Sequence, residues 1–307
     1  MSSPFGPLLL VANPNAGRGA VAAQLPRIED QLRTKGLDYR VHRTSGPGDA
    51  TGATRAALKA GGAFIVAVGG DGTVHEVVNG MFEDGEPVVP SPVLGVIAAG
   101  SGCDFVKTFG LPGDAIRACG HLEGSNTFPI DVGRVTYAGV DGGRETRFFP
   151  NIAEVGLGAA VVARAARLPR FVGKARYFVA FWLTLPGFKR TVISVRADRK
   201  SFEGGAHQVV VANCLFYGGG MMISPRSWPG DGFLEVLVFK GPKSDSFTLL
   251  PRIYRGEHLP NPNIVELRAS AVSIDGEHPL PVEADGEVLG RTPATFEVVP
   301  QAIRVKI

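Results

Sequence analysis

The stretch FIVAVGGDGTVHEVVNG, residues 64–80, joins an apolar run directly to a glycine-rich turn. The five apolar residues from Phe64 to Val68 predict a short strand that is covered on both faces. The apolar residues after the turn recur at helical spacing, so a helix is expected to begin near Thr73. The turn therefore lies where a strand ends and a helix begins, which in open α/β sheets is where ligands collect.

The turn itself, Gly69-Gly70-Asp71-Gly72-Thr73, has the composition of a phosphate site. Glycines let the backbone approach a phosphate, and the N–H groups and dipole of the helix favour its negative charge. Asp71 would repel phosphates unless a cation lay between them. A metal nucleotide such as Mg-ATP removes that conflict.

Two patterns of secondary structure divide the chain. The first 130 residues alternate strand and helix signals, which predicts parallel strands joined by helical crossovers. After about residue 130, short β-type runs separated by Gly, Pro and Asp turns predict a second, mainly antiparallel β-sandwich. We therefore expect an α/β N-terminal domain over residues 1–130 and a β-sandwich domain over residues 131–299, interrupted by helices near residues 157–185 and 244–255.

Composition excludes several classes of protein. The chain has 307 residues, 44% of them hydrophobic, and a formal net charge of +3, which is too weak to indicate nucleic acid as a partner. Cys103, Cys119 and Cys214 form no CxxC pair, which argues against a disulfide framework or a zinc site and suits the cytoplasm. We expect no targeting segment. The longest uncharged apolar stretch, residues 177–188, is too short to span a bilayer.

A second glycine-containing loop, Asn13 to Gly19, follows the first predicted strand. Gly17 to Ala22 matches the GxGxxA pattern of dinucleotide sites, but Asp38, about twenty residues further on, precedes the second strand instead of ending it. A simple loop with a helix cap is the plainer alternative. A phosphate-facing loop is favoured, and the lack of GxxxxGK[ST] excludes a Walker-type loop.

Further motifs accompany GGDGT along essentially the whole chain. They are Asn13–Gly19 (NPNAGRG), Thr44 with Gly48-Asp49-Ala50, Glu76 with Asn79-Gly80, Gly100–Phe105 (GSGCDF), Tyr217–Met221 (YGGGM), Asp231–Glu235 (DGFLE) and Asp285–Glu287 (DGE). In this order they resemble the diacylglycerol-kinase-like lipid kinases, the soluble bacterial branch that is related to sphingosine and ceramide kinases. Two positions depart from the family pattern: Cys103 replaces the usual Asn, and Ser101 replaces Thr. Either change would alter nucleotide affinity, but neither removes a carboxylate.

The resemblance implies ATP as substrate and Mg²⁺ as its metal, bound in a cleft between the two domains. It also implies that a C-terminal strand near residues 300–307 returns to the first domain. The residues expected to bind the nucleotide are Asn13, Pro14, Asn15, Ala16, Gly17, Thr44, Gly69, Gly70, Asp71, Gly72, Thr73, Glu76 and Ser101.

Phosphoryl transfer to an alcohol also needs a carboxylate that accepts the hydroxyl proton. Asp285 and Glu287 alternate along PVEADGEVL, so both would face one side of a strand unless Gly286 marks a turn. An ordinary hairpin turn with solvated acids is the open alternative. With the resemblance, Glu287 is favoured as the general base, Asp285 as its pair or as sharing the role, and Asp71 as the third catalytic carboxylate.

The segment Asp231-Gly232-Phe233 is on its own most typical of a turn. The resemblance implies that it holds a structural Mg²⁺. Carried over, the ligands are the carboxylate of Asp231 and the backbone carbonyls of Trp228 and Phe233.

A basic stretch without any acid lies beside aromatic residues in the second domain. Its basic members are Arg164, Arg167, Arg170, Lys174 and Arg176, and the aromatic ones are Phe171, Tyr177, Phe178, Phe181 and Trp182. This composition suits docking to an anionic membrane surface, although a solvated helix face over a sandwich core fits equally well.

We expect an ATP-dependent lipid kinase that phosphorylates a hydroxyl of diacylglycerol, giving phosphatidic acid, or of a related lipid. The expected partner is a lipid substrate at a membrane surface, and no nucleic-acid partner is expected. The protein is expected to be cytoplasmic and peripherally associated with the membrane. A homodimer is left open. The alternatives are a NAD kinase, which shares GGDGT, and a nucleotide- or lipid-binding regulator that has lost catalysis.

Overall fold

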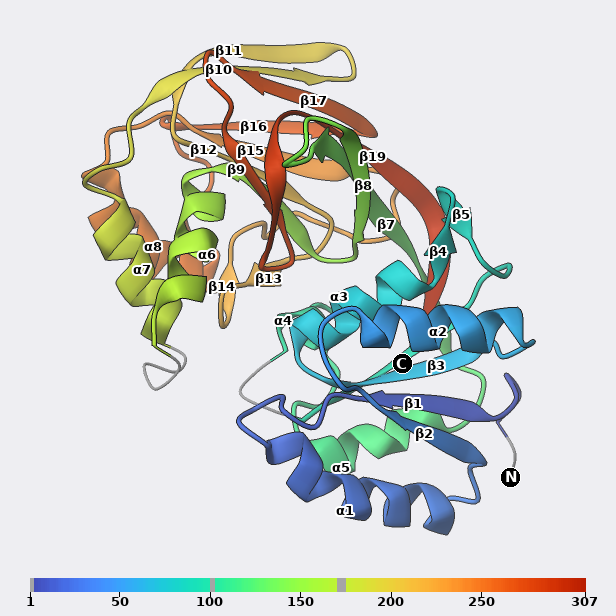
Figure 1. The fold of residues 1–307 in the computed structure, drawn as a ribbon. Coiled ribbons are helices and arrows are strands. Elements are labelled where there is room, and N and C mark those ends of the chain that lie inside the picture. The colour runs from blue at the N-terminus through green and yellow to red at the C-terminus, as the bar shows by residue number, and fades with distance from the viewer. Residues whose placement is uncertain (1–2, 100–102, 170–174) are drawn as a thin grey trace. The chain divides into compact units, whose positions relative to one another are not determined.

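A computed structural model describes residues 3–99, 103–169 and 175–307 of the protein. The chain divides into two compact units: residues up to Val132 together with Pro300–Ile307 form the first, and Gly133–Val299 form the second. Figure 1 follows the chain from the N-terminus in blue to the C-terminus in red.

A parallel sheet is the frame of the first unit. Its strands lie in the order β6-β3-β1-β2, and each neighbouring pair is parallel. The last part of the long strand β19 (Glu287–Lys306) pairs in parallel with β6 through Arg304 and Val305. The other elements are β1 (Leu8–Ala12), α1 (Ala20–Thr34), β2 (Tyr39–Arg43), α2 (Asp49–Lys59), β3 (Phe64–Gly69), α3 (Asp71–Gly80), β4 (Phe82–Glu83), β5 (Glu86–Pro87), β6 (Val93–Ala98), α4 (Asp104–Thr108), α5 (Ala115–Ala118) and η1 (Cys119–Leu122).

Burial explains why these sequences form this sheet. Every residue of β3 and of β6 is buried, as expected of central parallel strands with helices on both faces. Figure 1 shows α2 and α3 on one face of the sheet and α1 with α5 on the other. The apolar side of α1 packs on the sheet through Val21, Leu25, Ile28 and Leu32, which recur at helical spacing.

The second unit is a β-sandwich, and the pairings recorded within it are antiparallel. One layer has the order β16-β15-β12-β9-β18-β19, and the other joins β11, β10 and β17 to β19. The strands are β7 (Thr127–Ala138), β8 (Arg144–Phe149), β9 (Ile152–Gly156), β10 (Thr191–Ala197), β11 (Lys200–Ala206), β12 (Gln208–Ala212), β15 (Leu234–Phe239), β16 (Ile264–Ala269), β17 (Ala271–Gly276) and β18 (Pro281–Ala284). The expected fold class, an α/β domain followed by a mainly antiparallel sandwich, is confirmed.

Helices cover the outer face of the first sandwich layer. Along β9, Ala153 and Val155 face the sandwich core, while Ile152 belongs to a separate apolar cluster on the outer face. The elements that cover this face include α6 (Leu157–Arg167), α7 (Arg176–Thr184), α8 (Asp245–Arg255) and the hairpin of β13 (Phe216–Tyr217) with β14 (Met221–Met222). None of the helices within the described ranges is long and apolar enough to cross a membrane.

Candidate active site

Three loops that carry predicted nucleotide-binding residues share one edge of the first sheet. The N–H of Asn13 donates to the carbonyl of Val68 at 3.1 Å, which joins the ends of β1 and β3. The N–H of Thr44 donates to Ala12 at 2.9 Å and so ties the end of β2 to the same edge. The carboxyl ends of parallel strands meet at one edge of a sheet, and the structure brings these residues together there.

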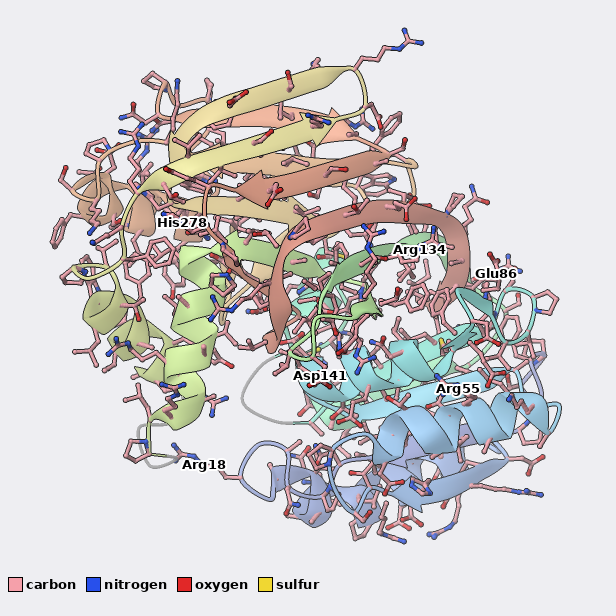
Figure 2. All side chains as sticks on the ribbon, turned by 45° about the horizontal axis from the view of Figure 1, so that its top comes forward. Arg18, Arg55, Glu86, Arg134, Asp141 and His278 are labelled. Atoms are coloured by element: carbon pink, nitrogen blue, oxygen red, sulfur yellow. The ribbon has the colours of Figure 1, made fainter. Side chains whose placement is uncertain are left out.

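The loop after β1 is a compact turn. The side-chain oxygen of Asn13 accepts the N–H of Asn15 at 3.1 Å, and the backbone carbonyl of Asn13 accepts the N–H of Ala16 at 3.0 Å. Pro14 lies between them. The next three residues, Gly17, Arg18 and Gly19, have φ values of 61°, 62° and 88°. Figure 2 labels Arg18 on this loop. A non-glycine residue in the left-handed region is a local strain of the kind that clusters at binding sites.

The GGDGT turn is shaped by its first glycine. Helix α3 begins at Asp71, directly after Gly70, and therefore includes Gly72 and Thr73. Gly69 is buried, and a Cβ atom there would collide with the hydroxyl of Thr73. Only glycine allows the first turn of the helix to pack this closely on the end of β3.

Asp71 faces the start of α4. Its carboxylate accepts the N–H of Asp104 at 2.9 Å, the N–H of Phe105 at 3.1 Å and the thiol of Cys103 at 3.3 Å. Burial, and to a lesser extent the charge of Asp104, raises the pKa of Asp71. A metal cation beside this carboxylate would favour its ionised form, so the group fits the expected metal nucleotide chemically, and it also caps the start of α4.

Cys103 is a neighbour of Asp71 that the sequence showed only as a departure from the family pattern. Its thiol keeps a donor toward Asp71 where the family has an amide. Burial above all, and then the charge of Asp71 and the hydrogen bond to it, raise the pKa of the thiol well above its ordinary value, so Cys103 is a neutral donor. Ser101, the other departure from the family pattern, lies outside the described residues.

Glu76 lies one turn and a half into α3 and caps a different helix. Its Oε2 accepts the N–H groups of Gly48 and Ala50 at 3.0 and 3.2 Å, at the start of α2. A carboxylate at a helix N-terminus satisfies backbone donors and complements the helix dipole. The structure thus gives Glu76 a packing role between α2 and α3, and its contact with a nucleotide stays a prediction.

The Asp285-Gly286-Glu287 segment is a hairpin turn between β18 and β19. Asp285 and Gly286 have φ values of 50° and 87°, the signature of a two-residue turn with both central residues left-handed. The expectation that Asp285 and Glu287 lie along one unbroken strand is therefore wrong, because Gly286 marks a turn. Asp285 lies in the turn, and Glu287 is the first residue of β19 and is exposed.

The two carboxylates of this hairpin have different surroundings. Oδ1 of Asp285 accepts the N–H groups of Asn151 and Ile152 at 3.2 and 3.0 Å, and the N–H of Asp285 donates to the carbonyl of Ile152 at 2.9 Å. Asp285 thereby fixes the turn to the start of β9. The exposed carboxylate of Glu287 is the better placed of the two to meet a substrate.

Tyr177, at the start of α7, is a neighbour of this turn that the motifs did not indicate. A Cβ atom at Gly286 would lie 3.8 Å from its hydroxyl, and Arg176 donates to the same hydroxyl at 3.2 Å. The sequence shows Tyr177 only as part of an aromatic stretch, because the contact depends on how α7 packs on the sandwich.

Asp231 is engaged by an arginine. Its Oδ2 accepts a hydrogen bond from Arg268 at 2.6 Å, its Oδ1 accepts the N–H of Phe233 at 3.0 Å, and the guanidinium also lies over the Phe233 ring. The carbonyl of Trp228, the other expected ligand, accepts the N–H of Gly230. A divalent cation would compete with Arg268 for the carboxylate, and this metal site stays a prediction. Across the described ranges, no three His, Cys, Asp or Glu side chains form a metal-binding group.

Models of two protein families match the two parts of the chain. Residues 7–135 match the diacylglycerol kinase catalytic domain, and residues 151–307 match the YegS C-terminal NAD kinase beta sandwich-like domain.

Similar proteins come from several bacteria. The chain is 28% identical over 290 residues to a diacylglycerol kinase of Bacillus subtilis, covering 94% of this chain and 91% of that protein. It is 28% identical over 308 residues to a Klebsiella pneumoniae protein named "Probable lipid kinase YegS-like", covering 99% and 97%. The crystal structure of a diacylglycerol kinase from Bacillus anthracis has the same fold, with a TM-score of 0.74, 23% identity and coverage of 99% and 97%.

Proposed function

The chain belongs to the diacylglycerol-kinase-like lipid kinases, which are phosphotransferases with an alcohol acceptor, and we propose that it phosphorylates a hydroxyl of diacylglycerol with ATP. The product is then phosphatidic acid. The observation that carries the proposal is the DGE hairpin, where Asp285 is committed to backbone amides and leaves Glu287 exposed.

Each requirement of the reaction has a candidate group in the chain. The glycine turn after β3 and the start of α3 offer backbone N–H groups to the nucleotide phosphates. Mg²⁺, when bound with the nucleotide, spreads the negative charge that develops on the transferred phosphoryl group, and Asp71 is the carboxylate that would orient it. Glu287 accepts the proton of the lipid hydroxyl as the oxygen attacks.

The structural Mg²⁺ proposed at Asp231 is tested by freeing its carboxylate. Mg²⁺ is expected to raise the melting temperature of the wild type and to raise that of Arg268→Met more, because the cation no longer competes with the guanidinium. It should leave Asp231→Ala unchanged. Thermal unfolding with and without excess Mg²⁺ checks this, and equal stabilisation of all three proteins would refute the site.

We further propose that the outer face of α7 and α8 touches the membrane that contains the lipid. Phe178 and Phe247 are 53% and 67% exposed, and both have ring contacts with Trp182. Arg164 and Arg167 are exposed on the last turn of α6. Exposed aromatic rings beside arginines suit an anionic lipid surface. Arg170 and Lys174, which the sequence also assigned to this stretch, lie outside the described residues.

The double variant Phe178→Ser/Phe247→Ser should lose about tenfold or more in affinity for anionic vesicles, because two rings no longer leave water on docking. Binding by the wild type should also weaken as salt screens the arginines. Co-sedimentation measures both effects. Val140→Ser is the matched control, since Val140 is 94% exposed in the β7–β8 turn. Equal loss in the control, or none in the double variant, would argue against this surface.

The proposed activity is tested by ATP turnover with and without diacylglycerol vesicles. A lipid kinase turns over ATP only with the lipid, and a NAD kinase does so only with NAD. A regulator that has lost catalysis turns over ATP with neither acceptor.

A further inference from the structure

Two buried glutamates face each other on neighbouring strands of the second unit. Glu154 on β9 and Glu283 on β18 are directly opposed in the antiparallel register, and each is 2% exposed. Directly opposed residues of an antiparallel pair hold their Cβ atoms about 4.5–5.5 Å apart. Two carboxyl groups therefore share one small, water-poor space.

The alternation of the strands shows which face these side chains occupy. Val282 and Ala284, on either side of Glu283, belong to the sandwich core, as do Ala153 and Val155 beside Glu154. Both glutamates consequently point to the outer face of the layer. Helix α6 packs against both strands, and a Cβ atom at Gly158 would collide with the carboxylate of Glu154.

The hydrogen bonds of the pair are all with neutral donors. The amide of Gln208 and the hydroxyl of Tyr217 donate to Glu154. The N–H of Gly286 donates to Oε2 of Glu283 at 2.8 Å. The other titratable groups that shift the pKa values of the pair are Tyr217 and Asp285. Within the described part of the chain, no basic side chain shifts them.

A buried carboxyl pair without a cation cannot ionise fully. Burial raises the pKa of Glu154 to about 7. Burial, with the charge of Glu154 added, raises the pKa of Glu283 well above its ordinary value. The pair thus retains at least one proton at neutral pH.

We propose that Glu154 and Glu283 share a proton and that Glu283, through the N–H of Gly286, is the positioning residue that fixes the turn carrying Glu287. Two carboxyl groups anchor the turn. Asp285 accepts an N–H group at the start of β9, and Glu283, on β18, accepts the N–H of Gly286. The positioning role rests on the proposed function, because it concerns the base of that reaction.

The shared proton predicts a pH dependence of stability. Since the pKa of both groups is raised by folding, the unfolded chain releases these protons at lower pH than the folded one does. The stability linked to Glu154 is complete below the ordinary pKa of glutamate and is lost as the pH rises through about 7, and the raised pKa of Glu283 acts in the same direction. The melting temperature of the wild type should therefore fall more steeply between pH 5 and pH 8 than that of Glu154→Gln/Glu283→Gln.

The positioning role is tested by two variants of Glu283. Glu283→Gln keeps an oxygen that accepts the Gly286 N–H. Its kcat at neutral pH should therefore stay within about threefold of the wild-type value, which is a smaller change than the loss of one hydrogen bond would cause. Glu283→Met keeps the volume but removes the acceptor, so kcat should fall about tenfold or more at unchanged ATP affinity. Glu203→Gln, an exposed carboxyl on β11, is the control. Wild-type kcat in Glu283→Met, or equal losses in the Gln and Met variants, would overturn the role.

An infrared measurement tests the proton without relying on activity or on the folding of the Met variant. The wild type at neutral pH should show the carbonyl stretch of a protonated carboxyl group that is shielded from water, and the double Gln variant should lack it. Absence of the band in the wild type would overturn the shared proton. If the band is present but the wild type phosphorylates no lipid, the proposed function fails and the shared proton stands.

Discussion

Replacing Glu287 with glutamine is expected to lower kcat by about 10²–10⁴-fold, the usual contribution of a general base, and to leave ATP affinity unchanged. Glutamine keeps the shape and polarity of the side chain but cannot accept the proton of the attacking hydroxyl. Glu287 is exposed on β19, so the substitution removes no buried charge. Steady-state rates on diacylglycerol vesicles and calorimetric ATP titrations give the two quantities.

Asp285→Asn is the matched control for this experiment. Its remaining side-chain oxygen still accepts the N–H groups of Asn151 and Ile152, so the turn is retained and the loss of kcat should be the smaller one. A larger loss in Asp285→Asn than in Glu287→Gln would move the base to Asp285. Wild-type rates in both variants would leave the hairpin without a catalytic role.

The second large effect is expected for Asp71→Asn, which should lower kcat by at least about 10²-fold and should also lower the melting temperature. The catalytic loss follows from removing the negative charge that orients the metal nucleotide. The stability loss follows because the amide NH₂ group would replace Oδ2, which accepts the N–H of Asp104 at 3.1 Å, and because the remaining oxygen would be neutral toward the N–H groups of Asp104 and Phe105. One hydrogen bond to a charged group is worth about 1.5–3 kcal/mol.

Two measurements separate these effects. Turnover is measured well below the melting temperature of the variant, and Mg-ATP affinity is measured by calorimetry at the same temperature. Cys103→Ser is the control, because serine keeps a donor toward Asp71 and should retain turnover. Near-normal turnover in Asp71→Asn would remove this residue from the mechanism.

Local patterns were sufficient to predict the layout of both units. The apolar run from Phe64 and the glycines after it predicted the end of β3 and the start of α3 to within about two residues. Short β-type runs between turns predicted the sandwich. These features depend on neighbours in the sequence, so they can be recognised without the fold.

The parts that sequence did not predict depend on contacts between distant segments. Glu154 and Glu283 alternate with apolar residues, a pattern typical of solvated positions, and are buried only because helices cover the outer face of the sheet. The bonds of Glu76 to the start of α2 and of Arg268 to Asp231 likewise join residues 26 or more positions apart. The DGE segment remained open because glycine suits both a bulge and a turn.

The most direct test of the central claim is the identity of the phosphorylated product. The purified protein is incubated with Mg-ATP and vesicles that contain diacylglycerol, and the lipids and nucleotides are analysed by mass spectrometry. The proposed function predicts phosphatidic acid that accumulates in proportion to the ATP consumed, with none formed by Glu287→Gln on the same timescale. Phosphorylated NAD from a parallel incubation, or ATP binding without any phosphorylated lipid, would contradict it.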